Sequence, residues 1–151
     1  MIRILFVCHG NICRSTMAEF VLKDMVARRG LADKFEIASA ATSTEEVGNP
    51  VHPGTQAVLR EHGLGGFEKK RARQLRRADY DQWDCLIGMD TANIRNMNWI
   101  LGGDPEGKVH KLLEFAGTNR SVDDPWYTGD FETTYNDVVD GCEGLLAYLG
   151  F

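Results

Sequence analysis

The chain has 151 residues, of which 43% are hydrophobic and 26% charged, and its formal net charge is −5 at pH 7. This size and composition predict one folded domain over residues 1–151, and they argue against a disordered or fibrous chain. The negative charge argues against binding to nucleic acid or anionic lipid. No apolar run approaches the ~20 residues that span a bilayer, so no membrane partner is expected.

Cysteine usage indicates a reducing compartment. The four cysteines are too scattered for a disulfide scaffold, and the opening MIRILFVC resembles a buried strand rather than a signal peptide. We therefore expect reduced thiols and a cytoplasmic protein. No cysteine or histidine pair has the spacing of a zinc site, so we expect no metal and no cofactor. The cysteines are Cys8, Cys13, Cys85 and Cys142.

The first half of the chain predicts two strands and two helices. The apolar run 2–7 predicts a buried strand. After Ser15, apolar residues recur at helical spacing up to a stop at Gly30, and Thr16 and Glu19 have the spacing of a capping box. Residues 35–40 predict a second strand and residues 42–51 a loop. A helix then begins near Pro53 and ends at Gly63.

The second half continues this alternation. Residues 86–89 predict a third strand, 91–101 a helix, 109–115 a fourth strand and 117–129 a loop, and apolar positions from 138 to 149 follow helical spacing. Alternating strands and helices predict an α/β fold with three layers, in which helices flank a short four-stranded parallel sheet. Ligands bind at the carboxyl ends of such strands, where the segment starting at Cys8 lies.

The segment 8–15, with the sequence CHGNICRS, has the features of an anion-binding loop. It joins a strand to a helix N-terminus, where free N–H groups and the helix dipole favour negative charge. Gly10 and Asn11 tolerate the left-handed backbone that turns N–H groups toward one point. Arg14 adds a planar fork that suits phosphate. The segment therefore predicts a site for a dianion.

The same surroundings favour the thiolate form of Cys8 over the thiol. Ser15 is placed to donate a hydroxyl hydrogen bond to the sulfur. A thiolate at the base of a phosphate cradle is suited to in-line attack on phosphorus. No lysine follows the loop as it does in nucleotide-triphosphate loops, so that class is excluded.

These residues resemble the low-molecular-weight protein tyrosine phosphatases, whose loop has the pattern C-x-G-N-x-C-R-S near the N-terminus. The resemblance continues to Asp124-Pro125 and covers nearly the whole chain. It implies a Rossmann-like phosphatase fold and a metal-independent enzyme that hydrolyses phosphotyrosine in proteins, or aryl phosphates, through a phosphocysteine intermediate. Inorganic phosphate would be the product. The loop residues His9, Gly10, Asn11, Ile12, Cys13 and Ser15 would bind the substrate.

A phenolate leaving group needs a proton donor, and the resemblance assigns this role to Asp124. In the family, the aspartate before the proline protonates the leaving oxygen and later activates water. Neighbouring Asp123 and the phosphate would favour the protonated acid by like-charge repulsion. Pro125 holds the residue before it in extended geometry, which helps to aim the carboxylate. An ordinary Asp-Pro turn is the alternative.

The resemblance also suggests two walls of a slot for a flat aromatic group. Trp126 and Tyr127 would form one wall. Glu45 occupies the second wall, where the family often carries Trp or Tyr, and its carboxylate is expected to repel acidic phosphopeptides and tolerate basic ones. Glu45 is alternatively a solvated loop charge.

Three further residues resemble the network that braces the family's loop, namely Asn11, Ser39 and His62. His62 is alternatively a helix C-terminal residue that interacts with the dipole. Asp90 either orients Arg14 or caps the following helix. The basic run 69–77 is interpreted as a solvated face.

Cys13 has two interpretations that are compatible with each other. It could trap oxidised Cys8 as a disulfide, a reversible redox brake that the resemblance supports. It could also be a buried packing residue.

Three rival functions remain. A protein-arginine phosphatase on the same scaffold tends to carry Thr at the position of Ile12, so Ile12 favours tyrosine. An arsenate reductase would need a relay pair of cysteines, whereas Cys85 and Cys142 are lone residues on apolar segments. A phosphate-binding module without turnover would need no proton donor such as Asp124.

Overall fold

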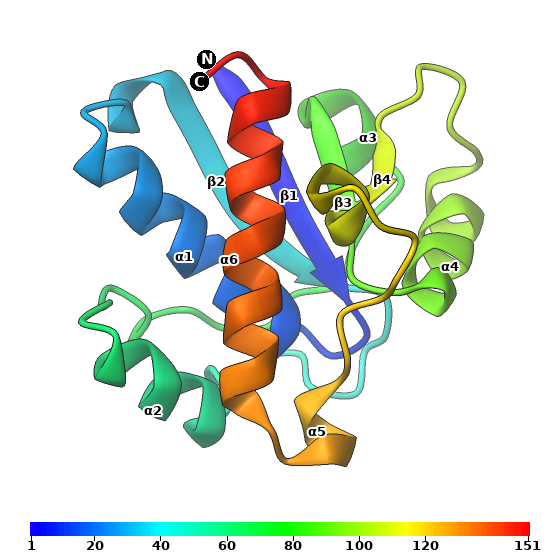
Figure 1. Ribbon diagram of the computed structural model, residues 1–151. Helices are drawn as coiled ribbons and strands as arrows, with labels where there is room; N and C mark the ends of the chain where they lie inside the picture. The colour runs from blue at the N-terminus through cyan, green and yellow to red at the C-terminus, as the bar shows by residue number, and fades with distance from the viewer.

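The computed structural model describes residues 1–151 and is built around one parallel sheet. The strands are β1 (Ile2–Cys8), β2 (Phe35–Ala41), β3 (Cys85–Gly88) and β4 (Val109–Lys111), in the spatial order β2-β1-β3-β4 (Figure 1). All three neighbouring pairs are parallel. The predicted four-stranded parallel sheet is therefore confirmed.

Helices cover both faces of the sheet. Helices α1 (Arg14–Arg28) and α6 (Phe131–Tyr148) cross one face, with α2 (Pro53–Glu61) packed against both, whereas α3 (Asp79–Gln82) and α4 (Thr91–Leu101) belong to the other side (Figure 1). Two 3-10 turns, η1 (Ala32–Lys34) and η2 (Leu112–Ala116), and the one-turn helix α5 (Pro125–Thr128) complete the chain. The three-layer α/β prediction holds.

Strand β1 is the centre of the core because its side chains alternate between the two faces. Ile4 and Phe6 pack into the cluster that contains the buried faces of α1 and α6. Leu5 and Val7 pack into a second cluster with residues of α3 and α4. Burial of each such side chain stabilises the fold by roughly 1.5–3 kcal/mol. This central strand therefore holds Cys8, its last residue, in a fixed position.

The short elements differ from those predicted. Strand β4 ends at Lys111, and the chain then turns into η2 instead of continuing as a strand to residue 115. Neither α3 nor α5 was predicted, because four-residue helices are too short to produce an apolar period. Helix α4 spans the residues expected, since Asp90 caps its start and Gly102 ends it in the left-handed conformation.

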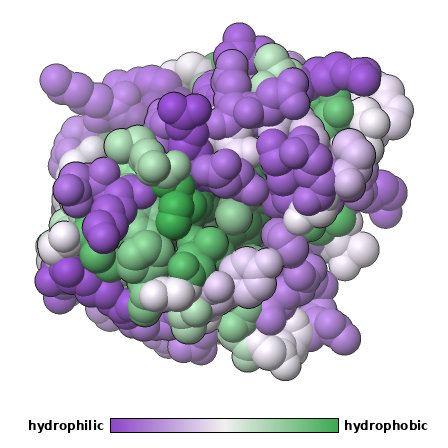
Figure 2. Space-filling model, turned by 90° about the horizontal axis from the view of Figure 1, so that it is seen from above, coloured by the Kyte–Doolittle hydropathy of each residue, from purple (hydrophilic) through white to green (hydrophobic).

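The two chain ends lie together at the end of the molecule away from the strand tips (Figure 1). Figure 2 looks onto this end and shows hydrophobic surface surrounded by hydrophilic side chains. The last residue, Phe151, packs edge-on against Phe35 there, with 5.2 Å between ring centroids. Among the helices, none combines the length and the apolar composition that a membrane span requires.

Candidate active site

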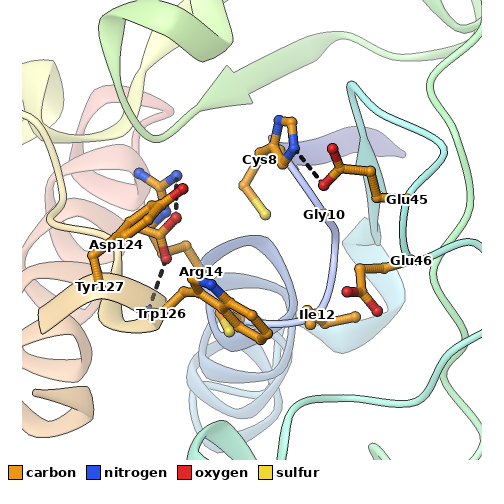
Figure 3. Close-up of a pocket in the computed structure, with 11 residues that line it drawn as sticks. Cys8, Gly10, Ile12, Arg14, Glu45, Glu46, Asp124, Trp126 and Tyr127 are labelled. Carbon is orange, nitrogen blue, oxygen red and sulfur yellow. Dashed lines mark hydrogen bonds and ion pairs between the residues drawn. The ribbon is translucent and has the colours of Figure 1, made fainter. Parts of the chain in front are cut away.

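The segment from Cys8 to Ser15 leaves the end of β1 and enters α1 beneath a cavity of about 210 Å³ (Figure 3). This volume is below the ~300–1,000 Å³ of pockets for drug-sized ligands, so the cavity suits a group the size of a side chain. The cavity is lined by Cys8, His9, Gly10, Ile12, Cys13, Arg14, Glu45, Glu46, Asp124, Trp126 and Tyr127.

The Cys8 sulfur lies at the base of this cavity and is surrounded by hydrogen-bond donors. The backbone N–H of Asn11 donates to Sγ at 3.3 Å, and the Ser15 hydroxyl lies 3.0 Å from it. Helix α1 has no side-chain cap at Cys13. The backbone N–H groups of Gly10, Ile12, Cys13 and Arg14 donate to no group of the protein. Uncapped N–H groups and the helix dipole make the cavity favourable for an anion.

The backbone turn of this loop depends on Asn11. Asn11 has φ 59°, and it is the one residue other than glycine with positive φ. Asparagine tolerates this conformation better than most residues. Gly10 was expected to share it and does not; instead, a Cβ at Gly10 would lie 3.3 Å from Cγ of Glu46, so its missing side chain allows the loop 43–50 to approach.

The Asn11 side chain holds this turn in place and orders the hydrogen bonds around the sulfur. Its Nδ2 donates to the hydroxyls of Ser15 and Ser39, both at 2.8 Å, and its Oδ1 accepts from the backbone N–H of Arg73. Ser39 in turn donates to the carboxylate of Glu19. Because Ser15 accepts from Asn11, its own proton is available to the Cys8 sulfur.

Glu19 is the residue of this network that the sequence analysis missed. Its carboxylate is 4% exposed, accepts from Lys23 at 2.6 Å and lies 3.5 Å from Nζ of Lys70. Burial lowers the pKa of Lys70, although the charge of Glu19 opposes that shift. The expected capping box of Thr16 and Glu19 does not form, because the Thr16 hydroxyl donates to the Cys13 carbonyl instead.

His62 does not join the network, which corrects the expectation from the resemblance. It follows the last residue of α2, and its Nε2 lies 2.8 Å from Oε1 of Glu132. Its ring stacks on Tyr135 with 3.8 Å between centroids. Lys70 lies next to Ser39 instead, and its Nζ donates to the Ser39 carbonyl at 2.8 Å. His62 therefore joins α2 to α6 rather than bracing the loop.

Arg14 is buried below the cavity and surrounded by acceptors. Its NH1 donates to Asp90 at 2.8 Å and to the Val122 carbonyl at 2.9 Å, and its NH2 lies 3.5 Å from Oδ2 of Asp124. Burial lowers the pKa of Arg14, but the negative charges of Cys8, Asp90 and Asp124 outweigh it and raise the pKa above its ordinary value. The guanidinium therefore stays charged at the base of the site.

Asp124 lies on the opposite side of the cavity from the loop 43–50 (Figure 3). It is the N-cap of α5, and its Oδ1 accepts from the backbone N–H of Trp126 at 3.0 Å. Pro125 occupies the first turn of that helix, where a missing N–H costs nothing. The Asp-Pro step thus begins a one-turn helix and points the carboxylate at the cavity.

The two expected walls face each other across Cys8 and Ile12 (Figure 3). Trp126 and Tyr127 form one wall and are 58% and 84% exposed. Glu45 lies on the other wall, and its Oε2 is 3.0 Å from Nε2 of His9. The sequence analysis did not single out Glu46, whose carboxylate also lines the cavity and accepts from Asn49 at 2.6 Å.

Burial affects the thiols of the other three cysteines. Cys13 also lines the cavity, but burial and then the negative charges of Cys8 and Asp124 raise the pKa of its thiol to about 12. Burial likewise raises the pKa of Cys85, in β3, and of Cys142, in α6. Neither Cys85 nor Cys142 lines the cavity, so the structure brings no relay pair of cysteines to it.

Two other findings bear on the expected partners. No group of three or more histidine, cysteine, aspartate or glutamate side chains is arranged to hold a metal ion. The basic run 69–77 is only partly solvated, because Lys70 reaches Glu19 and Arg73 forms two hydrogen bonds with Asp79 at 3.1 Å.

Fold and loop together define an α/β protein with a cysteine-containing anion site at the strand ends. Comparison with known protein families shows which family has this fold and loop. Residues 3–150 match the family model described as low molecular weight phosphotyrosine protein phosphatase. The chain therefore belongs to this family.

Individual relatives agree with the family assignment. The chain is 41% identical to the low molecular weight protein-tyrosine-phosphatase YfkJ of Bacillus subtilis, over 99% of this chain and 96% of that protein. The crystal structure of YfkJ has a TM-score of 0.94 at 40% identity, and it matches 99% of this chain and 94% of that chain. A low molecular weight protein tyrosine phosphatase from Streptococcus pyogenes has a TM-score of 0.90 at 40% identity, matching 100% and 95% of the two chains. A Drosophila arginine phosphatase has a TM-score of 0.87 at 29% identity, matching 98% of both chains.

Proposed function

We propose that this protein hydrolyses phosphotyrosine in proteins, with Cys8 as nucleophile, Arg14 as phosphate clamp and Asp124 as general acid and base. One observation carries the proposal: Cys8, Arg14 and Asp124 line the same cavity, and the charged Arg14 guanidinium lies 3.5 Å from the Asp124 carboxylate. Family membership and the relatives named as tyrosine phosphatases support it.

In the first step the Cys8 thiolate attacks phosphorus in line with the leaving phenolic oxygen. The S–P bond forms as the P–O bond to the aryl group breaks, and Asp124 gives its proton to the departing oxygen. The free N–H groups of the loop and Arg14 hold the equatorial phosphoryl oxygens, where charge is concentrated in the transition state. The donated bond from Ser15 stabilises the sulfur whenever it carries negative charge.

In the second step water hydrolyses the phosphocysteine. The Asp124 carboxylate takes a proton from water as the water oxygen attacks phosphorus, and the S–P bond breaks. Cys8 returns as thiolate, Asp124 is again protonated, and inorganic phosphate leaves. The Arg14 guanidinium holds the phosphoryl group in both steps, and its raised pKa keeps it charged throughout.

The choice of tyrosine over arginine rests on Ile12 and the aromatic wall. Ile12 is 8% exposed and lines the same cavity as Trp126 and Tyr127. A phenyl ring gains dispersion and apolar burial between such side chains. A phosphorylated guanidinium instead needs polar partners for its N–H groups, and Ile12 supplies none.

Phosphate release from matched peptides carrying phosphotyrosine, phosphoarginine or phosphoserine tests this function. We expect turnover of the phosphotyrosine peptide in the presence of EDTA, and no turnover by Cys8→Ser. A preference for phosphoarginine would reject the tyrosine assignment, and inhibition by EDTA would reject a metal-independent mechanism. Phosphate binding without turnover would identify a binding module.

Peptide preference follows from the wall formed by Glu45 and Glu46. Both carboxylates line the cavity mouth, and Arg14, the single lysine or arginine that lines it, is committed to the phosphate. We propose that phosphotyrosine peptides with neighbouring basic residues are preferred over acidic ones. Exchange of Glu45 and Glu46 for glutamine should abolish this preference and leave the rate with a small aryl phosphate unchanged; an unchanged preference would reject it.

A reducing compartment, the cytoplasm, suits this chemistry because the proposed nucleophile works only as a reduced thiol.

We further propose that peroxide oxidises Cys8 to the sulfenic acid, and that the Cys13 thiol displaces water from it to form a disulfide. The test is a loss of two hydrogens in the mass of the inactivated protein that dithiothreitol reverses. Inactivation without that mass change would reject the role of Cys13.

A further inference from the structure

Asp124 lies at the end of a segment that has no regular secondary structure. Residues 118–124 belong to no helix or strand, and the helix that follows has four residues. The one-turn helix α5, which Asp124 caps, is the only regular element next to the segment that holds this carboxylate directly. Its position therefore depends on the contacts that tie the segment to the rest of the fold.

A bidentate ion pair joins the segment to α6. Both terminal nitrogens of Arg120 donate to the two oxygens of Asp137, at 2.9 and 2.7 Å. Asp137 belongs to the buried side of α6, as do Thr134 and Val138. A bidentate pair of this kind fixes orientation as well as distance, because the planar guanidinium matches the two carboxylate oxygens.

Other contacts continue from this pair toward Asp124. The Thr134 hydroxyl, one turn earlier on α6, donates to the Asp123 carbonyl at 3.2 Å. Between these two attachments, the Val122 backbone donates to Met89 at 3.0 Å and accepts from Arg14 at 2.9 Å. The segment from Arg120 to Asp123 is thus aligned by α6 on one side and by Arg14 on the other.

We propose that Arg120 and Asp137 are positioning residues that hold Asp124 within reach of the leaving-group oxygen. This rests on the proposed function, in which Asp124 is the general acid. Neither residue lines the cavity, so their effect on the reaction is transmitted through the segment 120–124. A displaced acid slows the reactions that need protonation of the leaving group and spares those that do not.

The distinguishing readout is the dependence of rate on the leaving group. We would measure kcat/KM for phenyl phosphate, a poor leaving group, and for 2-chloro-4-nitrophenyl phosphate, a good one. We expect Asp137→Asn to lower the value for phenyl phosphate about tenfold, a part of the 10²–10⁴-fold that a positioned acid supplies. The value for the chloronitrophenyl ester should stay within about twofold.

Arg120 provides a second variant on the exposed side of the pair, which keeps the test valid if Asp137→Asn folds poorly. Arg120→Met should reproduce the selective loss, and Arg120→Lys, which keeps the charge, should recover part of the phenyl phosphate rate. Glu143→Gln is the matched control, because Glu143 also lies on α6 and pairs with Arg29 at 2.6 Å, away from the segment 118–124. The Glu143→Gln substitution should change kcat/KM for the two aryl phosphates equally and only slightly.

A selective loss in the Asp137 or Arg120 variants, absent in Glu143→Gln, would support the proposal. Equal slowing of the two substrates, or no slowing of either, would overturn it. A wild-type protein that hydrolyses neither ester would instead reject the proposed function itself. Thermal unfolding of each variant separates loss of folded protein from loss of alignment, because unfolding lowers both rates equally.

Discussion

Arg14 and Asp90 form an ion pair at the base of the site, with 2.8 Å between NH1 and Oδ2. The other oxygen of Asp90 accepts from the backbone N–H of Asn93 at 2.7 Å and so caps α4. The two roles that the sequence left open for Asp90 are therefore both present. One carboxylate links the orientation of the phosphate clamp to the start of a helix on the other face of the sheet.

Asp90→Asn separates these two roles. Asparagine caps helices about as well as aspartate, so we expect the free energy of unfolding to change by less than ~0.5 kcal/mol. Without its charged partner, the Arg14 guanidinium should no longer be held in the orientation that binds phosphate. The inhibition constant for inorganic phosphate should therefore rise about tenfold, since a hydrogen bond to a charged group contributes ~1.5–3 kcal/mol. Asp90→Ala, which loses the cap as well, should cost a further ~1 kcal/mol of stability. Unchanged phosphate inhibition in Asp90→Asn would refute the orienting role.

Asp124→Asn removes the proton donor and keeps the cap of α5. We expect kcat for phenyl phosphate to fall ~10²–10⁴-fold, and esters with acidic leaving groups to be affected less during phosphoenzyme formation. A plot of log rate against leaving-group acidity should therefore be steeper for the variant than for the wild type. Parallel plots would mean that Asp124 does not protonate the leaving group.

Glu19→Gln tests whether the buried carboxylate orders the hydrogen bonds that end at Cys8. A glutamine can donate to Ser39 as well as accept from it, and it leaves Lys70 without its charged partner. We expect unfolding to become easier by ~1–3 kcal/mol and kcat to fall severalfold. Glu36→Gln is the control, because Glu36 forms an exposed pair with Arg3 at 2.9 Å, which contributes ~1 kcal/mol or less. Equal effects of the two substitutions would argue against the network.

The sequence predicted those parts of the fold and site that local rules determine. The long strands and helices followed from apolar period and caps, and the loop at 8–15 followed from a strand, a glycine and a helix N-terminus placed in succession. The helix 91–101 was predicted with its bounds because Asp90 and Gly102 signal both ends.

Contacts distant in sequence could not be predicted in this way. Glu19 and Thr16 have the spacing of a capping box, yet Glu19 meets Ser39 and Lys70, which local spacing cannot indicate. His62 was assigned to the network by resemblance, but its position at the end of α2 directs it to α6. Glu46 lines the cavity next to Gly10, where a Cβ would lie 3.3 Å from its Cγ, and sequence spacing does not indicate this contact.

The two thiols of the loop should differ in reactivity. Because burial and neighbouring negative charge raise the pKa of Cys13 to about 12, its reactive thiolate is scarce at neutral pH and becomes abundant only as the pH approaches that value. We expect iodoacetamide at neutral pH to label Cys8 alone, as shown by peptide mass spectrometry. Cys13→Ser should be labelled at the same rate as the wild type. A label on Cys13 would contradict this assignment.

Direct detection of a phosphocysteine on Cys8 is the sharpest test of the proposed chemistry. Asp124→Asn with 2-chloro-4-nitrophenyl phosphate suits the experiment, because the good leaving group allows the intermediate to form while loss of the base slows its hydrolysis. We expect one equivalent of chloronitrophenolate in a burst, and one phosphoryl group on the peptide that contains Cys8. No burst, or a phosphoryl group on any other residue, would contradict the account.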